Sequence, residues 1–229
     1  MKLFLKKSKF LSTLFIQSRD ILRIIYNQKR RSRFFWNLRK GDDKLSFDYN
    51  FTSDSLVFDV GAYIGSFTEK LSNKFNCKIY CFEPKLEYFD YLNQKFKNNE
   101  NIRIFNFALS NFTGTGMISS IGAGSSMVHR QENAVLEEIK VKSIYEFLKE
   151  ENINKIDLLY LNIEGSEYNL LDEIITKNIQ KKILHFQIQF HNFVDNSKVK
   201  RKAIRDILKK THTCKFNFPF IWERWDIKN

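Results

Sequence analysis

The stretch Leu56–Thr68, which reads LVFDVGAYIGSFT, constrains the fold of this chain more than any other. An apolar run carrying Asp59 leads into a turn that contains Gly61, and a helical pattern follows. Because Gly61 has no side chain, the backbone can turn sharply as it leaves the strand. A helix that opens at Ile64 or Gly65 presents unpaired N–H groups and the positive end of its dipole. The stretch therefore predicts a strand, a ligand-binding turn and a helix in succession.

This turn lacks the two best-known glycine patterns for binding phosphate groups. Position 63 is Tyr, so the G-x-G-x-x-G pattern is absent, and no Gly-Lys-Ser/Thr follows. Without a Cβ at Gly61 and Gly65, we expect a ligand to lie against bare main chain. A single turn of this kind occurs in many α/β proteins, so its function must be inferred from the segments downstream.

Strand-like apolar runs alternate with helical patterns along most of the chain. The predicted strands are residues 56–60, 78–82, 101–107, 156–163 and 182–190. The predicted helices are residues 65–75, 86–97, 143–151, a segment ending near 177, and 197–210. Such close alternation indicates a parallel sheet wound with helices. Residues 213–218 and 220–227 predict an antiparallel hairpin at the sheet edge.

Residues 109–142 interrupt this alternation with glycines and serines. We expect turns, a mobile loop and a short strand near residues 139–141. Within it, residues 119–130 form either a lid over a bound substrate or an ordinary turn. The residues that favour the lid are Ser125, Ser126, His129 and Arg130.

The net charge of +12 is concentrated near the N-terminus. Residues 1–40 hold twelve Lys or Arg against one acid, Asp20, which amounts to +11 and leaves +1 for the rest. We therefore divide the chain into a basic amphipathic helical extension, residues 1–45, and one domain, residues 46–229. Three cysteines without metal spacing, and no cleavable signal sequence, fit a reducing compartment, so we expect a cytoplasmic protein.

The basic extension has three interpretations. It packs its apolar face on the domain, it lies on an anionic membrane surface at the inner face of the membrane, or it attracts a nucleic-acid backbone. Its apolar runs are too short to span a bilayer. One basic run, residues 29–33, without a recognisable nucleic-acid module is weak evidence, so nucleic acid is not an expected partner. The oligomeric state is left open.

Polar residues follow the predicted strands, at the sheet edge where ligands bind in open α/β folds. Glu83 comes 24 residues after Asp59 and directly precedes Pro84. At that distance an acidic residue can accept hydrogen bonds from both hydroxyls of a ribose. The other strand ends carry residues 106–108, 162–164 and 189–191.

Four segments together resemble the FkbM family of S-adenosyl-L-methionine-dependent methyltransferases. They are FDVGAYIG at 58–65, FEP at 82–84, SS at 125–126 and DLLYLNIEGSE at 157–167. The resemblance covers roughly residues 55–192. It implies an α/β, Rossmann-like class I methyltransferase fold, with a seven-stranded, mostly parallel sheet and an antiparallel C-terminal hairpin. It also implies methyl transfer to a sugar hydroxyl of a glycan, a capsule or lipopolysaccharide precursor, or a related natural product.

The resemblance assigns S-adenosylmethionine to the first three strand ends. Gly61, Ala62 and Gly65 would contact its methionine part, and Asp59 would hold the amino group or orient the turn. Glu83 would hold the ribose, and residues 106–108 would surround the adenine. The predicted cofactor contacts are Asp59, Gly61, Ala62, Tyr63, Gly65, Glu83, Pro84, Asn106, Phe107 and Ala108.

The family usually has Lys and Asp where this chain has Tyr160 and Asn162. Asn162 cannot serve as a carboxylate, so we expect Glu164 to be the acidic residue at this strand end. For the base that takes the proton of the acceptor hydroxyl, His191 is the first candidate and Glu164 the second. Each also has a structural interpretation, as a buried polar residue or a partner of the glycine turn. Asn162 would hydrogen-bond the substrate.

A divalent ion held by Asn162, Glu164 and His191 is chemically possible, but no tight ligand spacing supports it, and we predict no metal. Trp222 and Trp225 form either an aromatic platform for a sugar or part of the core. Two rival functions remain. One is a nucleic-acid methyltransferase or binder that uses the basic extension, and the other is a cofactor-binding protein without catalysis.

Overall fold

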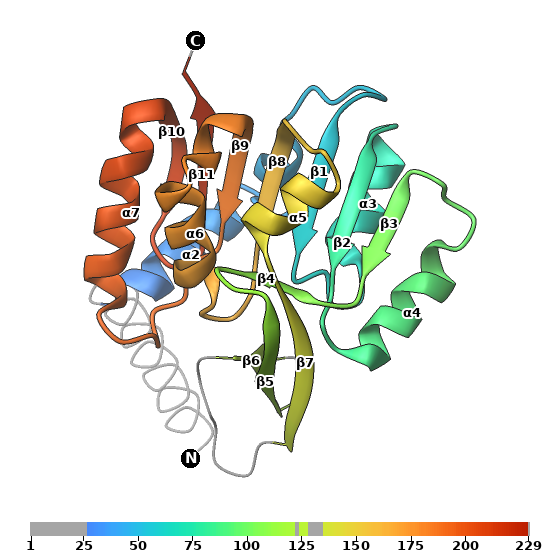
Figure 1. Ribbon diagram of the computed structural model, residues 1–229. Coiled ribbons are helices and arrows are strands. Elements are labelled where there is room, and N and C mark those ends of the chain that lie inside the picture. The colour runs from blue at the N-terminus through green and yellow to red at the C-terminus, as the bar shows by residue number, and fades with distance from the viewer. Residues whose placement is uncertain (1–26, 122–123, 128–134, 229) are drawn as a thin grey trace, which may run out of the picture.

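The computed structural model describes residues 27–121, 124–127 and 135–228 (Figure 1). Two β-sheets form the framework. The larger has seven strands in the order β10-β11-β9-β8-β1-β2-β3, and the smaller has four in the order β4-β7-β5-β6. Helices cover both faces of the larger sheet (Figure 1). The predicted α/β class and seven-stranded sheet are confirmed.

Five strands of the larger sheet are parallel, namely β1 (Leu56–Val60), β2 (Lys78–Phe82), β3 (Ile102–Phe105), β8 (Ile156–Leu161) and β9 (Ile183–Ile188). β10 (His212–Phe218) and β11 (Trp222–Ile227) form the predicted antiparallel hairpin, with β11 inserted between β9 and β10. From β1 the chain moves outward to β2 and β3, then returns to place β8 on the other side of β1. Strand order therefore reverses between β1 and β8, where open α/β sheets bind their ligands.

The central strands β1 and β8 are buried on both faces, and a separate hydrophobic cluster covers each face of the sheet. One face packs against α5 (Ile144–Glu150), α6 (Glu167–Thr176) and α7 (Ser197–Thr211). The other packs against α3 (Ser66–Lys74), α4 (Leu86–Phe96) and a segment that contains Phe47 and Tyr49. Neighbouring residues of β1 divide between the two, with Val57 in the second cluster and Phe58 in the first.

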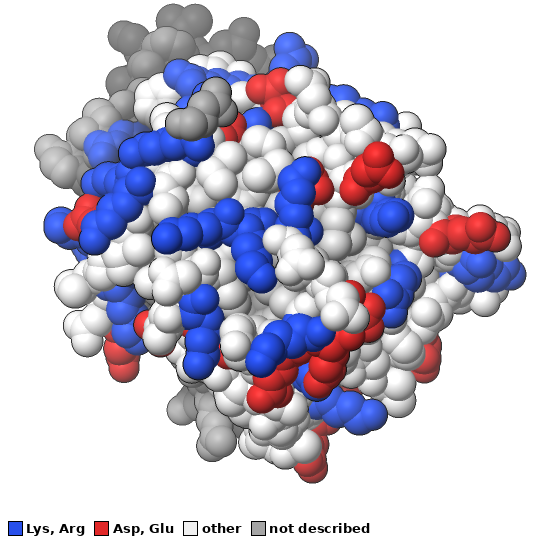
Figure 2. Space-filling model, turned by 45° about the horizontal axis from the view of Figure 1, so that its top comes forward, with Lys and Arg blue, Asp and Glu red and all other residues white. Residues whose placement is uncertain are grey.

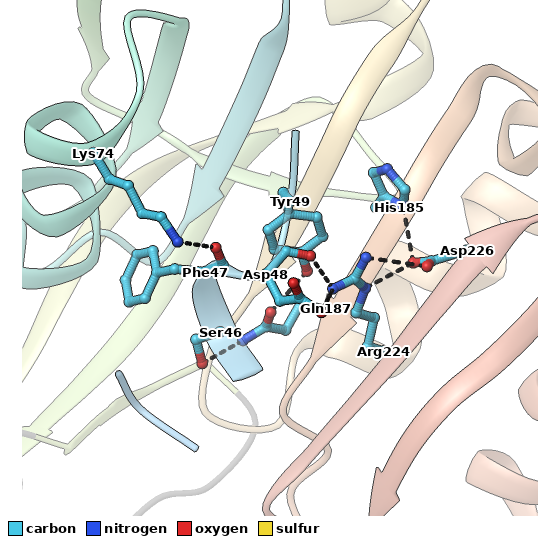
Figure 3. A network of polar contacts seen from close by, with 9 residues as sticks. All are labelled: Ser46, Phe47, Asp48, Tyr49, Lys74, His185, Gln187, Arg224 and Asp226. Atoms are coloured by element: carbon cyan, nitrogen blue, oxygen red, sulfur yellow. Dashed lines mark hydrogen bonds and ion pairs between the residues drawn. The ribbon is translucent and has the colours of Figure 1, made fainter. Parts of the chain in front are cut away.

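A buried polar network holds residues 46–49 against β9 and β11 (Figure 3). Gln187 on β9 accepts a hydrogen bond from the Tyr49 hydroxyl (2.8 Å) and donates one to Ser46 Oγ (2.9 Å). The Arg224 guanidinium of β11 lies 4.0 Å from the centroid of the Tyr49 ring. It also donates to the backbone oxygen of Asp48. These contacts fix the segment that precedes β1.

Residues 109–142 differ from the prediction of turns, a mobile loop and one short strand. They supply most of the second sheet, which consists of β4 (Ala108–Ser110), β5 (Gly114–Ile121), β6 (Gly124–Ser126) and β7 (Val135–Ser143). β5 and β7 pair in register from Gly114↔Val141 to Ser120↔Val135. Ile118, Ile139 and Val141 form the buried cluster of this sheet. His129 and Arg130 lie outside the described residues.

The helix α2 (Gln28–Leu38) precedes the sheet and packs on its β10–β11 edge. Trp36 is fully buried in a cluster with Phe218, Ile221 and Trp222. Trp225 is also fully buried, so both tryptophans of β11 are core residues and the predicted aromatic platform is wrong. The predicted helix over residues 1–26 lies outside the described residues, and the boundary at residue 45 stays a prediction. No helix in the described ranges is long and apolar enough to cross a membrane.

Candidate active site

A pocket lies at the carboxyl ends of β1, β2 and β8, where strand order reverses. Its walls include Val60, Phe82 and Ile163 from these strand ends, and Tyr88 from α4. Ile118 and Met127 come from the second sheet and close the pocket from above. The second sheet, in the segment that we expected to be a mobile loop, therefore covers the pocket. We call this sheet the roof.

The turn after β1 has an unusual backbone conformation, with φ of +84° at Gly61, +51° at Tyr63 and +71° at Gly65. A Cβ at Gly61 would lie 2.3 Å from the backbone oxygen of Asn162, and one at Gly65 would lie 2.6 Å from the Phe96 ring. Gly61 nevertheless lines the pocket, whereas Gly65 lies outside its lining, and the expectation that bare main chain at these glycines faces a ligand stays a prediction. Their missing side chains make room for the end of β8 and for α4.

Glu83 ends β2 and lines the pocket with 6% of its surface exposed. Its two carboxylate oxygens accept hydrogen bonds from the backbone N–H groups of Tyr63 (2.9 Å) and Lys85 (3.0 Å). Burial raises its pKa. Each oxygen keeps a further lone pair, so the fixed carboxylate can accept hydrogen bonds from two ligand hydroxyls.

Asp59 lies behind the turn. It is 1% exposed, its Oδ2 accepts a hydrogen bond from Thr68 Oγ1 (2.6 Å), and burial raises its pKa to about 7. Because the bond links β1 to the first turns of α3, these contacts support the second of its two predicted roles, which was to orient the turn.

The other predicted cofactor contacts divide into two groups. Gly61, Tyr63, Glu83, Pro84 and Ala108 line the pocket. The remaining ones stand outside its lining: Ala62 and Gly65 in the turn after β1, and Asn106 and Phe107 after β3. The Asn106 amide donates to the backbone oxygens of Glu83 (3.2 Å) and Pro84 (2.9 Å), which fixes the end of β2. Phe107 packs against Phe82 and Phe147.

Asn162, directly after β8, carries a polar atom without a protein partner. Its Oδ1 is buried and forms no hydrogen bond with any described residue, although the side chain lines the pocket. Buried acceptors in folded proteins are nearly always paired. The orphaned oxygen therefore points to a ligand that donates a hydrogen bond at this place.

Glu164 lines the pocket beside Asn162. His191 and Glu167, which fix its position, lie outside the pocket lining. The φ of Glu164 is +46°, and its Oε2 lies 3.3 Å from His191 Nε2. The other ring nitrogen of His191 lies 2.8 Å from Glu167 Oε1. Glu167, fully buried, also accepts hydrogen bonds from the backbone N–H groups of Ile163 (3.1 Å) and Gly165 (3.0 Å).

The charges in this cluster determine which residue can accept a proton. Burial by itself would lower the pKa of His191, but its contacts with Glu164 and Glu167 outweigh burial and raise that pKa to about 9. The hydrogen bond from His191 lowers the pKa of Glu164. At neutral pH His191 is therefore an imidazolium with both N–H groups engaged. It has no lone pair for a proton, and the arrangement favours Glu164 over our first candidate, His191.

Sequence reasoning missed two parts of this site. Glu167 received no role, although it is buried three residues after Glu164 in the EGSE run, where an unpaired acid would be costly. The roof was missed because its strands are rich in Gly and Ser. Ser126 of β6 donates to the backbone oxygen of Glu164 (2.7 Å), which ties the roof to the site.

Tyr160, which replaces the usual lysine of the resembling family, points away from the pocket. Its ring stacks on Phe67 with 3.6 Å between centroids, and Trp222 packs against it at 4.7 Å. Because side chains alternate along a strand, Tyr160 lies on the α3 face of β8. Its substitution therefore leaves the pocket wall unchanged. In the described ranges no three His, Cys, Asp or Glu side chains are grouped to hold a metal ion.

This strand order, with a pocket at the reversal and an acidic residue ending the second strand, defines a class I methyltransferase fold. The Methyltransferase FkbM domain matches residues 59–218, and the chain belongs to that family. Its cofactor is S-adenosylmethionine. The residues present fit this cofactor, because Glu83 can hold a ribose and Asn162 Oδ1 lacks a hydrogen-bond donor.

Solved structures show the same fold at low sequence identity. A putative rRNA-methylase from Clostridium thermocellum is 9% identical, with a TM-score of 0.50 over 84% of this chain and 96% of that one. A putative methyltransferase from Streptococcus mutans in complex with SAH is 12% identical, with a TM-score of 0.50 over 83% and 97%. Among curated proteins, none matches the sequence. These similarities support the fold and leave the acceptor to be inferred from the site.

Proposed function

We propose that this methyltransferase acts on a sugar hydroxyl of a glycan, a capsule or lipopolysaccharide precursor, or a related natural product. The observation that carries the proposal is the Glu164 carboxylate, which faces the pocket while His191 holds it from behind. A hydroxyl loses its proton when it is methylated, so a fixed carboxylate at the acceptor position suits an oxygen acceptor. The adjacent Asn162 can donate a hydrogen bond from its amide nitrogen to a neighbouring hydroxyl, and this leaves its Oδ1 for the cofactor.

In this proposal, different residues bind the cofactor and accept the proton. S-adenosylmethionine supplies an electrophilic methyl group when it is bound. Glu83 and Asn162 would hold it, through the fixed carboxylate of one and the orphaned oxygen of the other. Glu164 accepts a hydrogen bond from the acceptor hydroxyl and takes the proton that this hydroxyl loses. Alignment of the two reactants accounts for much of the expected rate enhancement.

His191 is a positioning residue in this proposal. Its two N–H groups connect the pocket carboxylate of Glu164 to the buried carboxylate of Glu167. The cation keeps Glu164 ionised at neutral pH, because it lowers the pKa of that carboxyl. Glu167 is itself fixed by two backbone N–H groups, so the whole cluster is rigid. The apolar roof residues Ile118 and Met127 limit the access of water.

The test is methyl transfer from labelled S-adenosylmethionine to a panel of sugar acceptors, with amines and RNA in parallel. We expect product with sugars, lost in Glu83→Ala because the cofactor no longer binds, which calorimetric titration would verify. Glu138→Gln, an exposed carboxylate of β7, is the matched control and should behave like wild type. Transfer to amines or RNA without any transfer to sugars would contradict the proposal, as would cofactor binding without turnover on any acceptor.

A further inference from the structure

The outward face of α2 exposes large apolar side chains. Phe34 is 48% exposed, Phe35 46% and Leu38 67%. The helix is nevertheless firmly placed, because Trp36 on its inner side is fully buried against β10 and β11. Phe34 and Leu38 are four residues apart and therefore share one helix face. A fixed helix thus presents a stripe of apolar residues to the outside.

The same helix is strongly basic. Residues 29–40 contain six Lys or Arg and no acidic residue. Lys29, Arg30 and Arg31 stand in the first turns of α2, where the helix dipole disfavours positive charge, and the first turn has no acid to offset them. Within the described part of the chain, neither Lys29 nor Arg30 has an ion-pair partner. The positive charges at the start of α2 therefore destabilise the helix and are suited to an anionic partner.

A groove beside this stripe adds further cations. It has a volume of about 440 Å³ and runs between α2 and β10. Arg31, Arg39 and Lys215 line it, with Phe35 and Phe218 as apolar walls, and the described residues contribute no acid to its lining. The Arg39 guanidinium lies 5.8 Å from the centroid of the Phe218 ring. The groove can therefore receive a phosphate group whose attached chain is apolar.

Some of the other basic residues of the protein form ion pairs with nearby carboxylates. Figure 2 shows Lys and Arg over much of the face that it presents, with Asp and Glu mostly toward its right and lower parts. Arg103, for example, pairs with Glu151 (2.7 Å), and Lys155 pairs with Asp157 (2.8 Å). What distinguishes α2 is that its cations lie beside the exposed apolar side chains of Phe34, Phe35 and Leu38.

We propose that the α2 docking face, defined as Arg30, Arg31, Phe34, Phe35, Leu38 and the adjoining groove, binds the surface of a bilayer that contains anionic phospholipids. Phe34 and Leu38 enter the boundary between headgroups and acyl chains, and the groove cations contact lipid phosphates. A nucleic acid would satisfy the cations, but it would leave the aliphatic Leu38 exposed. The combination of apolar stripe and cations therefore favours a membrane.

The first turn of the helix that carries the docking face lies within electrostatic reach of the active site. The charge of Lys29 is among the causes that lower the pKa of Glu164. An enzyme docked through α2 would hold its pocket close to the bilayer, where a lipid-linked glycan would be presented. This consequence for the acceptor rests on the proposed function, whereas the docking itself does not.

The test is sedimentation of the full chain with vesicles of phosphatidylcholine alone or mixed with phosphatidylglycerol. We expect binding to the mixed vesicles only, reduced by added salt. The triple variant Arg31→Gln/Arg39→Gln/Lys215→Gln should bind about 100-fold more weakly. Phe34→Ser/Leu38→Ser should weaken binding even at low salt, because it removes the inserted side chains. A triple control, Lys78→Gln/Lys97→Gln/Lys210→Gln, changes exposed cations on other elements and should retain binding.

The outcomes separate this proposal from the enzymatic one. Glu83→Ala should bind vesicles like wild type although it loses the cofactor, and cofactor affinity in the α2 variants checks their folding. No binding of the wild-type chain to mixed vesicles would overturn the proposal. Equal loss of vesicle binding in the groove variant and in the control would also overturn it. So would RNA binding that depends on the groove, if vesicle binding is absent.

Discussion

His185 and His191 lie close together in the chain, and each contacts a buried carboxylate. One of these clusters stabilises the fold, whereas the other supports the candidate active site. His185 lies within β9, and His191 comes three residues after its end. His185 Nδ1 lies 2.8 Å from Asp226, which also accepts hydrogen bonds from Arg224 Nε (2.8 Å) and Nη2 (3.1 Å) (Figure 3). His191 likewise lies 2.8 Å from the carboxylate of Glu167.

The difference lies in where each cluster ends. The contacts of Asp226 lead through Arg224 to the backbone of Asp48, so that cluster ends inside the protein and fixes a chain segment. The contacts of His191 lead to Glu164, whose carboxylate faces the pocket beside the orphaned oxygen of Asn162. Similar residue types therefore stabilise the fold in one place and prepare chemistry in the other. The distinction depends on an adjacent cavity.

The sharpest test of this difference is Glu164→Gln. The amide keeps the shape of the side chain but cannot take a proton, so kcat should fall about 10²–10⁴-fold. Cofactor affinity should stay near the wild-type value, whereas the free energy of unfolding should fall, because the amide cannot form an ion pair with the His191 cation. Steady-state kinetics with a methylated sugar acceptor, together with calorimetry, would measure these quantities. Unchanged kcat would remove Glu164 from the chemistry.

The pH dependence of stability tests the charge of His191. Its pKa rises from an ordinary 6.5 to about 9 on folding, so its contribution is complete below pH 6.5 and is lost as the pH rises through 9. The free energy of unfolding should fall by about 3 kcal/mol over this window. The raised pKa of Asp59, about 7, changes the free energy of unfolding at lower pH, between about 4 and 7.

Denaturant titrations at several pH values above 7 would isolate the contribution of His191 from that of Asp59. His191→Gln should abolish most of the decrease, and kcat should fall together with it because Glu164 loses its support. If the variant kept the same slope, the imidazolium interpretation would be wrong.

The second cluster should affect stability rather than catalysis. Asp226→Asn removes the carboxylate shared by His185 and Arg224, and the free energy of unfolding should fall by about 2 kcal/mol. The kcat of the folded enzyme should not change. Asp43→Asn is the matched control, because the Asp43–Lys70 pair is exposed and should contribute nothing measurable. A selective loss of kcat in Asp226→Asn would erase the distinction between the two clusters.

Local patterns predicted the framework well. The ranges 56–60 and 78–82 coincide with β1 and β2, because each apolar run is bounded by a glycine turn or by Pro84. The second sheet was missed because β5 is mostly Gly, Ser and Thr, residues whose strand state depends on pairing with the distant β7. The state of His191 was missed for a similar reason, since its charge depends on Glu167, which is 24 residues away.

The position of β11 affects how this protein is made. β10 leaves the ribosome before β11, yet it has no other neighbour in the larger sheet. While the chain is being synthesised, β9 therefore presents an open edge, with backbone groups that could pair with another nascent chain. That edge closes only when residues 222–227 insert between β9 and β10. Completion of the larger sheet therefore depends on a strand that follows both of its neighbours in the chain.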